Sequence, residues 1–63
     1  MTEYQINLLF DMMDDIHQFR DSAKQIENYD LMHHYTNQAV LLYRVFRILN
    51  IHEKYFNERV NKV

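Results

Sequence analysis

Residues 23–35, with the sequence AKQIENYDLMHHY, contain the point at which the hydrophobic pattern of this chain changes phase. Before this point, apolar residues recur at alternating steps of three and four, at Leu9, Met12, Ile16, Phe19, Ala23 and Ile26. Beyond it a second series with the same period begins, which misses one step at Glu53 and consists of Met32, Tyr35, Ala39, Leu42, Phe46, Leu49, Phe56 and Val60.

The two series cannot lie on one face of a single straight helix. Residues at these steps share a helical face, so the first series would continue through mostly polar positions at Asp30, His33, Asn37, Val40, Arg44 and Arg47. The chain must therefore break between the two series. This pattern predicts an all-α fold in which residues 1–63 form one domain, a helical hairpin of two long antiparallel helices with a turn near residues 28–30.

Local signals place the helix ends. Thr2 and Gln5 have the spacing of a capping box at the start of the first helix. We expect that helix to run to about Asn28, which tolerates a left-handed conformation, and Asp30 to cap the second helix. A break at residues 21–22 is the alternative, because Ser22 begins a second possible capping box. We rank it lower, since the first apolar series continues without losing phase.

The composition favours a small helical protein that is stabilised by association with another chain. The 63 residues include no glycine, proline or cysteine, which disfavours tight strand hairpins and excludes disulfides and thiolate zinc sites. A chain of this length buries only about 60% of the surface that its unfolded form exposes, so an isolated core is marginally stable. Oligomerisation is a common remedy.

Each helix also has a second apolar seam that its partner in the hairpin cannot cover. The seam of the second helix contains Leu41, Val45, Ile48 and Tyr55, and the shorter seam of the first contains Phe10 and Met13. Exposed together, they would form a larger apolar patch than soluble monomers usually carry. We predict that two hairpins pair through these six residues into a dimeric four-helix bundle. A different protein is the alternative occupant of this surface.

Charge is divided unequally between the two helices. Residues 1–30 contain seven acidic and two basic residues, whereas residues 31–63 contain five basic and two acidic ones. Antiparallel pairing is thus expected to place opposite charges side by side. No apolar run is long enough to span a membrane, and the N-terminus lacks the basic region of a signal peptide. We expect a cytoplasmic protein with no membrane partner.

Two residue pairs have spacings that occur in functional sites. Asp14 and His17 have the i, i+3 spacing of metal-binding helical bundles, but the second helix offers no ligands opposite them, and a solvated acidic face is the preferred interpretation. Arg47 and His52 match the Arg-x4-His spacing of helical ribonucleases of the HEPN class. Those domains are about twice as long and usually have a polar residue where this chain has Ile48. We predict no catalytic residues, no cofactor, no metal and no small-molecule substrate.

A basic face on the second helix gives an alternative function. Arg44, Arg47 and Lys54 could contact phosphates, and a two-fold dimer would double this stripe. The length and the expected architecture are similar to those of Rop, an RNA-binding dimeric four-helix bundle, which implies RNA or DNA as a partner. The preferred hypothesis is a small non-enzymatic homodimer that regulates or inhibits a larger cytoplasmic protein, because the spare apolar seams favour a protein partner.

Overall fold

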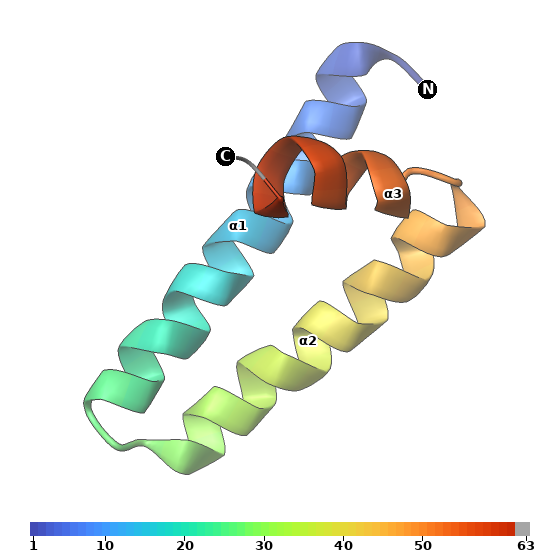
Figure 1. The fold of residues 1–63 in the computed structure, drawn as a ribbon. Coiled ribbons are helices and arrows are strands. Elements are labelled where there is room, and N and C mark those ends of the chain that lie inside the picture. Colours follow the sequence, from blue (N-terminus) through green and yellow to red (C-terminus); the bar gives the residue numbers. More distant parts are fainter. Residues whose placement is uncertain (62–63) are drawn as a thin grey trace.

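The computed structural model describes residues 1–61, and every element in this range is helical. Helices α1 (Glu3–Gln25) and α2 (Tyr29–Ile48) run antiparallel and pack along each other (Figure 1). The short helix α3 (His52–Tyr55) continues directly into a π-helical turn, η1 (Phe56–Val60), and this segment folds back across α1. The predicted helical hairpin is confirmed, with a third helical segment added to it.

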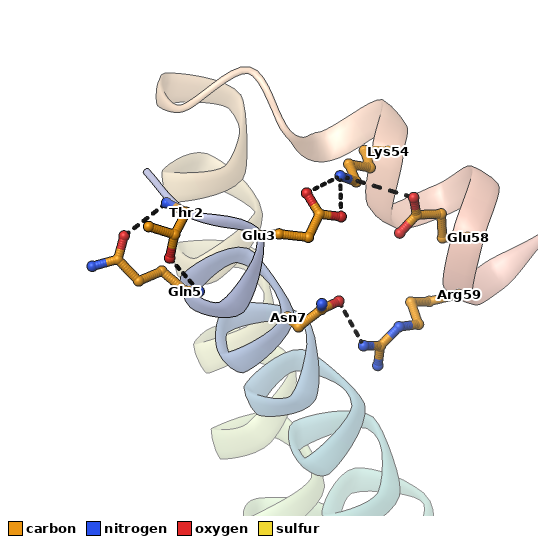
Figure 2. A network of polar contacts seen from close by, with 7 residues as sticks. All are labelled: Thr2, Glu3, Gln5, Asn7, Lys54, Glu58 and Arg59. Atoms are coloured by element: carbon orange, nitrogen blue, oxygen red, sulfur yellow. Dashed lines mark hydrogen bonds and ion pairs between the residues drawn. The ribbon is translucent and has the colours of Figure 1, made fainter.

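The start of α1 matches its sequence signal. The backbone N–H of Gln5 donates to the Thr2 hydroxyl over 3.2 Å, and the Thr2 N–H donates to the Gln5 side chain over 2.9 Å (Figure 2). This reciprocal pair is the predicted capping box, and it satisfies amide groups that have no partner inside the helix. Glu3 follows in the first turn, where a negative charge is favoured by the helix dipole.

The turn between α1 and α2 differs in detail from the prediction. Helix α1 ends at Gln25, and the left-handed residue is Glu27, with φ of 58°, instead of Asn28. Asn28 is the N-cap of α2, since its side chain accepts a 3.2 Å bond from the Leu31 N–H, so Asp30 lies inside the helix. The Glu27 N–H donates to the Lys24 carbonyl and the Asn28 N–H to the Ala23 carbonyl, which is a Schellman motif.

A second Schellman motif ends α2 at Ile48. Asn50 adopts a left-handed φ of 58° and donates to the Arg47 carbonyl, while Ile51 donates to the Phe46 carbonyl. The accompanying apolar contact of this motif is available, because Ile51 and Phe46 are both buried in one cluster. The expectation that the second helix extends through Phe56 to Val60 is therefore wrong. Asparagine in the left-handed region supplies the break that glycine usually supplies.

The core lies where α3 crosses the hairpin. The rings of Phe10, Phe46 and Tyr55 form a mutually packed trio, with centroid separations of 5.2–5.4 Å and tilted or edge-on geometries. Such arrangements are the favoured ones for aromatic pairs. One residue of the trio comes from each of α1, α2 and α3, so the core exists only once all three have assembled. The buried residues are Phe10, Met13, Ala23, Ala39, Phe46, Ile51 and Tyr55.

Folding of α3 onto α1 changes which apolar seam is buried. Phe10, Met13 and Tyr55, which we expected on an exposed interface, are at most 1% exposed. In their place, Met12 and Phe19 of the first apolar series are about half exposed. Phe10 lies roughly 160° around α1 from Met12, because successive residues are about 100° apart. The segment after Asn50 covers the Phe10 side, and the Met12 side is left open.

Candidate interaction surface

Polar contacts hold the C-terminal segment on α1. The Arg59 guanidinium donates to Asp14 over 2.6 Å and to Asp11 over 3.1 Å, and it also reaches the Asn7 side chain over 3.3 Å (Figure 2 shows the Asn7 contact). Its carbon lies 5.7 Å from the centroid of the Phe10 ring. Hydrogen bonds with Asp11 and Asp14 raise the pKa of Arg59 above its usual value. Arg59 thus joins η1 to three successive turns of α1.

Beneath Arg59, two tyrosines connect the core to the polar side chains of α1. The Tyr55 hydroxyl donates to the Asp14 carboxylate over 3.0 Å, and the Tyr43 hydroxyl lies 3.1 Å from Nε2 of His17. Burial, followed by the bond to Asp14, raises the pKa of the Tyr55 phenol well above its usual range. Burial also raises the pKa of Tyr43 and lowers that of His17. Asp14 and His17, the pair with metal-ligand spacing, therefore bind different side chains of this chain.

The ion pairs between distant segments join α1 to α3 and η1. Lys54 contacts Glu3 over 2.8 Å and also lies 3.9 Å from Glu58 (Figure 2). The hydrogen bond with Glu3 raises the pKa of Lys54. We expected the acids of residues 1–30 to lie beside the bases of residues 31–63, and Glu3, Asp11 and Asp14 do pair with bases of that half. The bases are Lys54 and Arg59, because α3 and η1 fold onto α1, whereas Arg44 and Arg47 of α2 line a different surface.

The side of the hairpin opposite α3 carries an apolar groove. It is lined by Met12 and Ile16 of α1 and by Gln38, Leu41, Leu42 and Val45 of α2, none of which is charged. Leu8 lies one turn before Met12, and Ile48 lies one turn after Val45, so helical spacing extends the groove at this end. We call these eight residues the open face.

The structure divides the six predicted interface residues into two groups. Leu41, Val45 and Ile48 belong to the open face and are 59%, 39% and 79% exposed. Phe10, Met13 and Tyr55 are interior residues, as described above, because α3 packs where the partner was expected. Met12 and Ile16 were missing from the predicted interface. Both lie in the first apolar series, which we expected in the interior of the hairpin.

The three predicted phosphate-binding residues are also divided. Arg44 and Arg47 are exposed on α2, and neither forms an ion pair within residues 1–61. Lys54 is held by Glu3 and Glu58 on a different element. Arg44 and Arg47 instead lie beside His52, together with Val40, Tyr43 and Phe56, around a cleft of about 280 Å³ between α2 and α3. We call this the basic cleft.

Comparisons of the chain with protein-family models, with curated proteins and with solved structures find no match. None of the helices described within residues 1–61 is both long enough and apolar enough to cross a membrane. The same residues contain no group of three or more histidine, cysteine, aspartate or glutamate side chains placed to hold a metal ion.

Proposed function

We propose that this chain is a small, non-enzymatic interaction protein that acts as a homodimer through its open face and modulates a larger cytoplasmic protein. The observation that carries the proposal is the open face itself. Three of its residues (Leu41, Val45 and Ile48) are each at least 39% exposed, and its groove contains only one polar side chain, Gln38. A contiguous apolar surface without charge is typical of an interface.

The dimensions of the chain also favour self-association. Its principal extents are 37 × 26 × 17 Å, so it is a thin slab with the open face on one broad side. Its accessible surface is 4859 Å², compared with ~4400 Å² expected for a folded monomer of this mass. A second copy would convert the two-helix layer into a four-helix core, which is a standard way to bury such a face.

Charge complementarity favours one arrangement of the two copies. Asp15 borders the open face on the outer edge of α1, and Arg44 borders it on the outer edge of α2, by helical spacing from Met12 and Val45. If α1 of one copy lies over α2 of the other, each acidic edge meets a basic edge. If each helix lies over its own counterpart, like charges meet instead, which is unfavourable.

A valine-to-glutamate change on the open face, compared with the same change elsewhere on α2, tests this interface and controls for the added negative charge. Val45 lies on the open face and Val40 lies roughly 140° around the same helix, with exposures of 39% and 46%. We expect Val45→Glu to sediment at the monomer mass while it keeps its helical circular dichroism, and Val40→Glu to remain dimeric. The melting temperature of the unmodified chain should also rise with its concentration.

Binding of a partner protein should be lost in the same variant that loses the dimer. The dimer is the proposed binding form, so a protein captured from the native cells by the unmodified chain should also be captured by Val40→Glu and lost with Val45→Glu. A folded monomer at high concentration, with the open face in water, would disprove the homodimer. Equal capture by both variants would show that the partner does not need the dimer.

A further inference from the structure

We propose that the basic cleft binds single-stranded nucleic acid, with Arg44 and Arg47 on phosphate groups and the ring of Phe56 stacked on a base. The proposal does not require the homodimer: the cleft faces away from the open face, and Arg44, which borders both, is the one residue that the two surfaces share. It differs from the predicted basic face in two respects: it leaves out Lys54, and it adds Tyr43 of α2 together with His52 and Phe56, which the fold-back of the C-terminal segment brings in.

The two arginines provide the anion-binding part. They are three residues apart on α2, so their side chains leave the helix on neighbouring turns, and both are exposed. Among residues 1–61, Arg59, Lys54 and Arg20 each contact a carboxylate, whereas Arg44 and Arg47 contact none. No acidic side chain lines the cleft. Two uncompensated guanidinium groups that border one apolar cleft favour a phosphate-containing ligand.

The two aromatic residues that line the cleft, Tyr43 and Phe56, favour a ligand that carries a flat ring. Tyr43 and Phe56 lie nearly parallel, with an interplanar angle of 10° and centroids 5.5 Å apart. The Tyr43 hydroxyl is held by His17 on the far side, which fixes this ring, and Phe56 keeps 37% of its surface exposed. A base can therefore extend the stack on Phe56. Base-on-ring stacking above a basic groove is the common way to bind single strands, in which the bases are free to stack.

His52 also lines the cleft, and this chain leaves one of its ring nitrogens without a partner. Its Nδ1 atom is buried, and it is the one buried side-chain polar atom within residues 1–61 that lacks a hydrogen bond. Buried polar atoms normally have partners, so such an exception needs an explanation. The cleft volume of about 280 Å³ is close to the lower end of ligand sites, ~300–1000 Å³. The size suits one nucleotide of a strand whose remainder lies outside.

The direct test is the fluorescence anisotropy of labelled single-stranded oligouridine titrated with the full chain at several salt concentrations. The double variant Arg44→Gln with Arg47→Gln should weaken binding by about tenfold or more. The slope of log K against log salt concentration should become less negative by roughly 1.4, which corresponds to two lost phosphate contacts. The matched control is Arg20→Gln with Lys24→Gln, which removes the same charge from α1. It should leave the salt slope almost unchanged.

A second variant tests the ring separately from the charge. Phe56→Leu keeps an apolar side chain and should weaken oligouridine binding by about tenfold with an unchanged salt slope, because stacking is lost while both arginines remain. No binding at low salt, or an equal loss in the Arg20/Lys24 control, would overturn the proposal. Unchanged affinity in Phe56→Leu, with full displacement of oligouridine by inorganic tripolyphosphate, would show that the cleft binds anions without stacking on a base. That result would also overturn the proposal.

Duplex RNA supplies the remaining control. Its bases are already stacked within the helix, so they are not available to Phe56. We expect weaker binding of duplex RNA than of oligouridine at equal salt, and tighter binding of the duplex would contradict a stacking site. Val45→Glu should bind oligouridine as the unmodified chain does. The failure of the homodimer and the failure of this cleft can therefore be told apart.

Discussion

Arg59 and Asp14 are 45 residues apart in the chain, yet a guanidinium nitrogen of Arg59 lies 2.6 Å from the Asp14 carboxylate. This contact, with those to Asp11 and Asn7, fixes the C-terminal helical segment across α1. Together with the Tyr55 ring, which packs on Phe10, it keeps the Phe10 side of α1 covered, and the opposite side becomes the open face.

Replacing Arg59 should destabilise the fold without altering any residue of the core. We expect Arg59→Gln to lower the free energy of unfolding by roughly 1–2 kcal/mol, because charged hydrogen bonds of a partly exposed group are lost. Urea unfolding followed by circular dichroism measures the change. Arg20→Gln is the control, since the ion pair that Arg20 forms within residues 1–61 is with its sequence neighbour Asp21 and joins no distant segments. Equal stability of the two variants would show that Arg59 does not hold the segment.

The Tyr55 hydroxyl should contribute separately from the Tyr55 ring. Tyr55→Phe keeps the packing with Phe10 and Phe46 but removes the bond to Asp14, so the expected loss of stability is about 1 kcal/mol. Tyr4→Phe should have no measurable effect, because Tyr4 is 72% exposed. Both variants are compared by thermal and urea unfolding. A Tyr55→Phe chain as stable as Tyr4→Phe would mean that this hydrogen bond gives no net stabilisation.

The conformation of Glu27 predicts a substitution that stabilises the chain. Glu27 has a φ of 58°, which is costly for a residue with a Cβ atom and costs glycine little. Glu27→Gly should raise the free energy of unfolding by about 1 kcal/mol. The same change at Glu53, inside α3, should instead lower stability, by roughly 0.5–1 kcal/mol. If both glycine variants are destabilised alike, Glu27 does not adopt the left-handed conformation in solution.

Stability should fall as the solution becomes mildly acidic, in part because of His17. Burial and the nearby Arg20 lower the pKa of His17 below 6.5 in the folded chain. The unfolded chain therefore binds a proton first as the pH falls, so the stabilisation present above pH 6.5 is lost between this value and the lower folded pKa. His17→Gln should reduce this part of the pH dependence of unfolding. His33→Gln, on an exposed residue, should retain it.

Part of the fold could be predicted from local pattern. The change of phase between Ile26 and Met32 requires a break, because residues at three-four steps must share a face, and the structure has its turn there. The capping box of Thr2 and Gln5 was equally visible, because all of its atoms come from four consecutive residues. At the end of α2, the missing apolar step at Glu53 and the asparagine at position 50 were weak signals of a break.

The candidate surfaces depended on contacts that no local pattern contains. The apolar period allowed either Met12 or Phe10 to face inward, and the choice was made by Arg59 and Tyr55, more than 40 residues away. The same fold-back placed His52 and Phe56 beside Arg44 and Arg47. The sequence by itself thus determined the two long helices and their hairpin, since these follow from neighbouring residues. Only the tertiary structure decided which face is covered, because that depends on where a distant segment is most stable.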